Sequence, residues 1–159
     1  VPSFLGDVSA FPVSYQWSDR PKFYSSVSGN DFALYGWDQI EHLAKQYSFA
    51  EFILYGNTVP WPTRYPNVIV RGRVPKEQMN EEIKNMQGAL RLIPLEGFSE
   101  IICKSVLMGQ WPVSLIDYPH MLSVKDLWKV REKRAPNVEG REHYLQILND
   151  YPWNSQRHA

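Results

Sequence analysis

Three arginines near the middle of the chain carry side chains that could bind an anion. Arg71 and Arg73 would share one face of a strand formed by residues 67–74, and Gly72 between them would let a ligand approach closely. Arg64 lies in the preceding loop and could join them. Grouped guanidinium groups suit a carboxylate, a phosphate or a nucleic-acid backbone. The alternative is a solvated strand end with salt bridges to nearby carboxylates: Glu77, Glu81 or Glu82.

Asp117 and His120 are the candidates for acid–base or metal chemistry. They sit three residues apart in a turn that contains Pro119, so the carboxylate and the imidazole could converge as a catalytic pair or as two metal ligands. The alternative is a turn in which Asp117 caps a backbone N–H. The sequence lacks G-x-x-x-x-G-K-[ST], G-x-G-x-x-G, H-E-x-x-H and G-x-S-x-G. We therefore expect no cofactor, no metal and a non-enzymatic role, with an enzyme built on scattered Asp, His and Arg side chains as an alternative.

Cys103 is the single cysteine, and its apolar surroundings predict a buried, inert thiol. One cysteine excludes an internal disulfide and a cysteine cage for zinc. It also favours a reducing, intracellular and cytoplasmic setting. No apolar run reaches the length of a membrane span, and the first residues lack the pattern of a signal peptide.

The loop 57–66 is the strongest candidate for a binding surface. Pro60, Pro62 and Pro66 keep it extended and stiff, so it has little conformational freedom to lose when it binds. Trp61 lies between two of these prolines, and tryptophan and tyrosine are enriched at binding hot spots. The sequence therefore predicts a protein–protein interaction module, a subunit, adaptor or inhibitor, whose partner is another protein. The alternative is that Trp61 folds back and covers the core. The predicted contact residues are Trp61, Arg64, Tyr65, Arg71 and Arg73.

A nucleic-acid-binding domain is the alternative binding class. It would stack bases on an open sheet face, with Tyr35 and Tyr55 beside Arg71 and Arg73. Two features weigh against it. The segment 67–74 contains no aromatic residue, and the 17 basic and 17 acidic side chains leave the chain neutral. A second basic stretch, 125–134, is interpreted as the solvated face of an amphipathic helix.

Two similar hexapeptides predict the strands that position these residues. Residues 31–36 (DFALYG) and 51–56 (EFILYG) flank the helical pattern of 37–47, which predicts a strand–helix–strand unit. Residues 67–74 predict a further strand and 76–92 a helix. The segment 100–107 fits a strand or a helix equally well, because short apolar runs do not distinguish the two.

The order of these elements predicts a single α+β domain over 1–159 with a ferredoxin-like (split β-α-β) core at about 31–106. N-terminal strands are expected within 8–27, with the alternating segment 11–17 as an exposed edge strand because of Pro12. Two helices are expected within 123–150. The alternative is a small three-layer α/β sheet.

Overall fold

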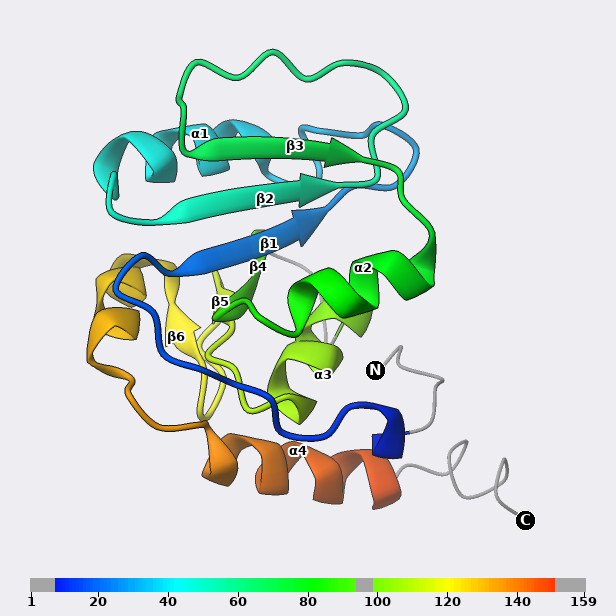
Figure 1. Cartoon of the computed structure of the whole chain (residues 1–159), viewed down its shortest axis with the longest axis vertical. Coiled ribbons are helices and arrows are strands. Elements are labelled where there is room, and N and C mark those ends of the chain that lie inside the picture. Colours follow the sequence, from blue (N-terminus) through cyan, green and yellow to red (C-terminus); the bar gives the residue numbers. More distant parts are fainter. Residues whose placement is uncertain (1–7, 94–98, 151–159) are drawn as a thin grey trace.

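A computed structural model describes residues 8–93 and 99–150, and within them a single six-stranded sheet runs through the molecule. Every pairing between neighbouring strands is parallel (Figure 1). The strand order is β3-β2-β1-β4-β5-β6, so the chain winds outward from a central strand in both directions. This is the doubly wound, Rossmann-like α/β arrangement. The strands are β1 (Lys22–Ser26), β2 (Glu51–Tyr55), β3 (Val68–Gly72), β4 (Gly88–Arg91), β5 (Val113–Ser114) and β6 (Leu122–Ser123).

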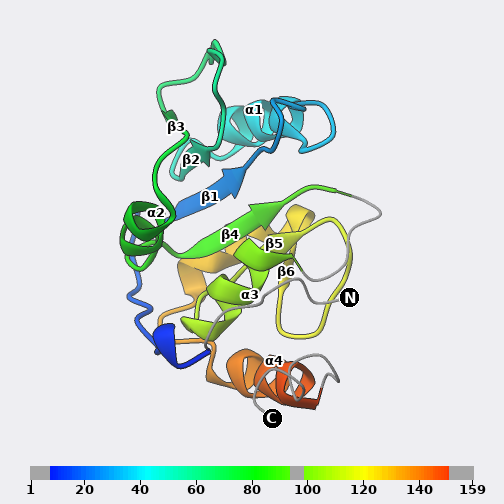
Figure 2. The same ribbon diagram turned by 90° about the vertical axis from the view of Figure 1, so that its right-hand side faces the viewer.

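Helices cover both faces of the sheet. One face packs against α1 (Trp37–Gln46) and the 3-10 segment η2 (Val124–Glu132). The other packs against α2 (Lys76–Ile83), α3 (Glu100–Leu107) and α4 (Val138–Asp150). Figure 2 looks toward the carboxyl ends of the strands and shows α1 and α2 on opposite sides of β1. A short 3-10 turn, η1 (Val8–Ala10), precedes β1. The result is three layers, with apolar packing on both sides of the sheet.

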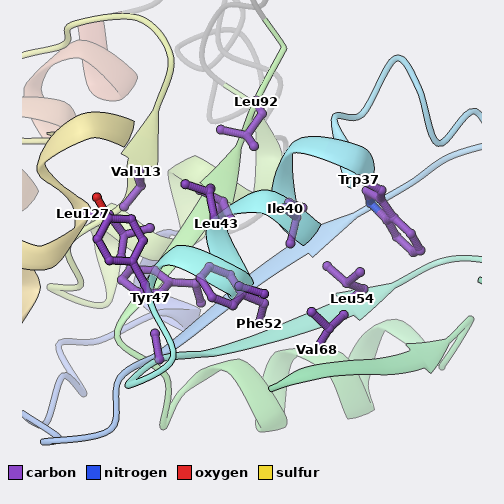
Figure 3. Packing of buried hydrophobic residues seen from close by; sticks show 14 of the residues in the cluster. Trp37, Ile40, Leu43, Tyr47, Phe52, Leu54, Val68, Leu92, Val113 and Leu127 are labelled. Atoms are coloured by element: carbon purple, nitrogen blue, oxygen red, sulfur yellow. The ribbon is translucent and has the colours of Figure 1, made fainter. Parts of the chain in front are cut away.

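Strand β2 explains why both layers are apolar. Phe52 and Leu54 face the α1 side, in the apolar cluster that also contains Ile40 and Leu43 of α1 (Figure 3), and Ile53 and Tyr55 face the α2 side. All four of these strand residues are buried. A strand that is apolar on both faces is typical of a parallel sheet that helices enclose.

The predicted ferredoxin-like core over 31–106 is wrong. That fold requires antiparallel neighbours, whereas every neighbouring pair in this sheet is parallel. The three-layer α/β alternative is the arrangement observed. The order of elements alone did not separate the two folds, because a strand–helix–strand unit occurs in both.

The first hexapeptide, 31–36, is not a strand. Its backbone forms hydrogen-bonded turns, with the Asp31 carboxylate accepting from the Leu34 N–H at 3.3 Å and the Tyr35 N–H donating to the Asp31 carbonyl. Gly36 adopts a left-handed φ of 72° immediately before α1. The place beside β2 is taken by β1, which pairs with it from Lys22 to Ser26.

The segment 11–17, predicted as an exposed edge strand, forms no strand. Phe11 and Tyr15 are buried instead, and the Tyr15 hydroxyl donates a 2.6 Å hydrogen bond to the Lys133 carbonyl. The N-terminal strand that does form, β1, is central, because it pairs with β2 on one side and β4 on the other. Alternation of apolar residues therefore reflected burial in an irregular segment rather than strand pairing.

The helix predicted over 76–92 ends early, at Ile83, and Gly88 to Arg91 form β4. The apolar spacing of Met79, Ile83 and Met86 suited a longer helix, but Gly88 and Ala89 pair with β1. Residues 100–107, which the sequence left as either a strand or a helix, form helix α3. Ser99 is its N-cap, and the hydroxyl accepts a 3.3 Å hydrogen bond from the Ile102 N–H.

Candidate functional site

Two hollows adjoin at the carboxyl ends of β1, β2 and β3. The first, of about 350 Å³, is lined by loop residues that follow these three strands. The second, of about 640 Å³, lies between the start of α2 and the start of α3. Arg73 lines both, and we call the two together the carboxyl-edge crevice. In open parallel sheets, ligands bind outside the carboxyl ends of the strands, where the strand order reverses. The residues that give the crevice its polar character are Ser26, Ser28, Asn30, Thr58, Arg73, Lys76, Glu100 and Lys104.

The structure separates Arg71 from Arg73. Strand β3 ends at Gly72, where the register with β2 shifts and the backbone takes a left-handed φ of 78°, so the strand alternation does not continue to Arg73. Arg71 turns toward α2 and donates two hydrogen bonds to Glu82, at 3.1 and 2.5 Å. These bonds hold the pKa of the Glu82 carboxyl down at about 2. Arg71 therefore forms a salt bridge with Glu82, as the alternative interpretation of the sequence expected.

Arg73 has no such partner. Its side chain is exposed, and within 8–93 and 99–150 it makes no ion pair or side-chain hydrogen bond. Lys76, one turn further on at the start of α2, carries a second positive charge into the same hollow. The amino ends of α2 and α3 both point here, and helix amino ends favour negative charge. This end of the crevice is suited to an anion.

Lys104 and Glu100 form the polar wall of the crevice on α3. The Lys104 side chain is only 6% exposed, and its ammonium lies 3.4 Å from the Glu100 carboxylate and 2.9 Å from the Asn80 side-chain oxygen. Burial lowers the pKa of Lys104 although the nearby carboxylate opposes this. Lys76 lies 2.7 Å from the same Glu100 oxygen. The crevice thus holds three cations and one carboxylate, a net positive site.

Hydrogen bonds join the loop after β1 to the loop after β2 within the crevice. The Asn30 amide donates to the Thr58 hydroxyl at 2.7 Å, and the Thr58 N–H donates to the Asn30 side-chain oxygen at 2.9 Å. Gly56 has a φ of 101°, and any side chain there would collide with the Val27 carbonyl. These contacts fix the loops after β1 and β2 relative to each other, which preforms this part of the site.

The predicted contact residues Trp61, Arg64 and Tyr65 line a different hollow, of about 330 Å³, beside α1. Trp61 is partly buried, with its ring 4.9 Å from the Phe32 centroid and 5.6 Å from that of Trp37. Trp61 therefore folds back toward the core, and Arg64 remains exposed. The loop itself arches beyond β3 at one edge of the sheet (Figure 1).

Asp117 and His120 lie in the loop between β5 and β6, and neither lines the carboxyl-edge crevice. Both are exposed, and His120 has a left-handed φ of 63°. Its ring centroid lies 5.2 Å from that of His143. In the described part of the chain, no three His, Cys, Asp or Glu side chains converge to hold a metal ion.

Cys103, Tyr55 and Tyr35, the remaining residues considered in the sequence, all lie outside the crevice lining. Cys103 is completely buried within α3. Tyr55 is buried, and its hydroxyl donates to Glu82 at 2.5 Å. Tyr35 lies in the turn before α1 beneath Arg91, whose guanidinium is 5.5 Å from the ring centroid. The open aromatic sheet face of the nucleic-acid alternative is absent from the described residues, since helices cover both faces.

The sequence interpretation missed most of the crevice. The sequence placed Lys76 at the start of a predicted helix and Lys104 in a segment that fits a strand or a helix, and no function was predicted for residues 28–30. A signal was present: a turn sequence directly after an apolar strand marks a carboxyl edge once the sheet is known to be parallel. Without the strand directions, nothing linked Asn30, Thr58 and Lys104, which are distant in the chain.

Comparison with known proteins identifies a related fold. No family model matches the sequence, and no curated protein does so either. The solved structure of TarM is similar, with a TM-score of 0.64, 12% identity and coverage of 89% of this chain and 35% of TarM. At this identity the likeness concerns the fold alone, and this chain spans about a third of TarM. Within the described ranges, none of the helices has the length and apolar character needed to cross a bilayer.

Proposed function

We propose that this chain is a small-molecule-binding α/β domain whose ligand carries a phosphate or diphosphate group. The ligand occupies the carboxyl-edge crevice with its anionic group at Arg73 and Lys76. The observation that carries the proposal is Arg73, a cation with no partner among the described residues where the two hollows adjoin. An intracellular location, which the single cysteine favours, belongs to the same proposal.

Size, charge and fold support this assignment. The larger hollow, about 640 Å³, is within the usual range for a small-molecule site. Arginine and lysine side chains at the amino ends of helices are typical of phosphate recognition. The fold places the crevice where open parallel sheets bind their ligands. None of these features assigns a catalytic step, so the proposal is one of binding.

Replacing Arg73 with alanine should weaken phosphate-ligand binding about tenfold or more, because a charge-assisted hydrogen bond contributes about 1.5–3 kcal/mol. The measurement is isothermal titration calorimetry of the wild type and the variant with pyrophosphate, ADP and UDP as probes. The matched control is Arg64→Ala, which removes the same charge from the hollow beside α1. Absence of binding by all three probes, or an equal loss in both variants, would contradict the proposal.

The second candidate is the protein-interaction role predicted from the loop 57–66. The specific observation in its favour is the hollow beside α1, where exposed Arg64 and partly exposed Tyr65 adjoin Trp61 and Pro62. Val59 in the same loop and Ile69 on the edge strand β3 are also exposed. In this reading, Arg64 and Tyr65 contact the partner directly and Trp61 holds the loop in place.

Arg64→Ala should weaken capture of a protein partner about tenfold, since interface arginines are frequent hot spots. The measurement is a quantitative pull-down from nuclease-treated extract of the source cells, with Arg73→Ala as the matched control. Thermal unfolding of both variants confirms that each is folded. Equal recovery by the wild type and Arg64→Ala would exclude Arg64 from the interface.

A further inference from the structure

The amino ends of the strands carry a second charged surface, distinct from the crevice. The segment 129–135, which we call the basic strap, begins within η2 and continues past its end. It passes beside the residues that precede β1, β2 and β5 (gold to orange in Figure 1). Three of its four cations lie over aromatic rings, with the charged group 3.7–4.5 Å from the ring centroid: Arg131 over Phe49, Lys133 over Trp111 and Arg134 over Trp17.

Hydrogen bonds fix the backbone of the strap to both of these tryptophans and to Tyr15. The Trp17 indole N–H donates to the Arg131 carbonyl at 2.9 Å, and the Trp111 indole N–H donates to the Ala135 carbonyl at 3.2 Å. The Tyr15 hydroxyl donates to the Lys133 carbonyl at 2.6 Å. The positive groups are therefore held in place before any partner arrives, which lowers the entropic cost of binding.

The three ring-bound cations lack carboxylate partners. Arg131, Lys133 and Arg134 form no ion pair within the described ranges, although the chain carries as many acidic as basic side chains. Lys129 differs, because its ammonium lies 3.8 Å from the Asp126 carboxylate. Arg131 and Arg134 are exposed. Glu132 lies between Arg131 and Lys133 in the sequence, is exposed and forms no ion pair with them in the described part of the chain, so the strap has a net positive charge that suits an external anion.

We propose that the basic strap docks an acidic segment of a partner protein, whose carboxylates bind the N–H edges of Arg131 and Arg134 and the ammonium of Lys133. A guanidinium stacked on a ring still presents its N–H edge, which matches a carboxylate in a bidentate manner.

Two features favour an acidic protein segment over a nucleic acid. Cations already lie over Phe49, Trp111 and Trp17, so the covered faces of these rings are not free to stack on bases. The chain as a whole has a formal charge of zero, so it lacks the overall positive field that favours a long, densely charged nucleic acid, whereas a short acidic segment needs only the local cations of the strap. A membrane surface fits less well, because lipid-binding clusters hold about 4–8 basic residues and the strap presents fewer unpaired ones.

The test is fluorescence anisotropy of a labelled poly-glutamate peptide with the full chain, at ionic strengths of about 0.01–0.15 M. The double variant Arg131→Gln/Arg134→Gln should bind the peptide about tenfold or more weakly than the wild type. The matched control is Lys45→Gln/Lys84→Gln, which removes two charges outside the strap and η2 and should bind like the wild type. Thermal unfolding of each variant verifies folding.

Three outcomes would overturn the proposal. One is the absence of peptide binding by the wild type at the lowest ionic strength. Another is an equal loss of affinity in the double variant and its control, which would indicate a non-specific charge effect. The last is tighter binding of an oligonucleotide or of anionic vesicles than of the peptide, which would assign the strap to a different partner.

Discussion

Replacement of Trp37 by alanine should lower the free energy of unfolding by about 3–5 kcal/mol, the cost typical of removing a buried aromatic side chain. Trp37 is completely buried at the start of α1. Its ring lies 4.9 Å from that of Phe32 and 5.6 Å from that of Trp61, measured between centroids. Loss of the ring would open a cavity between the sheet and α1 and remove the support of the 57–66 loop. Urea unfolding followed by circular dichroism measures the effect.

Two further variants make this prediction specific. Trp128→Ala removes the same side chain from an exposed site, 43% accessible, and should change stability by only about 0.5 kcal/mol. Trp37→Phe keeps an aromatic ring and removes an indole N–H that has no hydrogen-bond partner among the described residues. It should therefore cost less than Trp37→Ala. If Trp37→Ala and Trp128→Ala destabilise equally, Trp37 is not in the core.

Replacement of Gly88 by alanine should lower the free energy of unfolding by about 3 kcal/mol, the upper part of the usual range for overpacking. Gly88 begins β4, and a methyl group there would lie 2.8 Å from the Trp111 carbonyl carbon and closer still to its oxygen. The obstacle is backbone, which is held by the 2.9 Å hydrogen bond from the Trp111 N–H to the Gln87 carbonyl. Relief of the clash would push β4 away from the chain entering β5. The measurement is again urea unfolding.

Gly29→Ala is the matched control for Gly88→Ala. Gly29 has a left-handed φ of 63°, but no atom lies within 4 Å of an added methyl group. Its replacement should cost about 1–2 kcal/mol from backbone conformation alone. A cost for Gly88→Ala no greater than that of Gly29→Ala would show that β4 and the segment before β5 separate easily.

The sequence correctly predicted helix α1 and strands β2 and β3, and the physical reason is clear in each case. The helical spacing of Trp37, Ile40 and Leu43 predicted α1, because an amphipathic helix buries one stripe of side chains. The residues of β2 and β3 were also predicted from their β-branched and aromatic content. In each case the information lies within a few neighbouring residues.

The candidate site was predicted only in part from the sequence. Arg73 was selected as an anion-binding residue, but it was grouped with Arg71, which pairs with Glu82. The grouping failed because a bulge and a positive φ at Gly72 interrupt the strand, and neither is encoded by simple alternation. The single-domain and protein-binding predictions remain predictions.

By itself, the sequence determined which segments are apolar, where helices can begin and that the chain carries no net charge. It did not determine that 22–26 rather than 31–36 pairs with β2, because both segments have suitable composition. The tertiary structure decided that choice, and with it the parallel sheet, the carboxyl-edge crevice and the basic strap. The physical reason is that strand pairing is a competition among distant segments, settled by packing on both faces of the whole sheet.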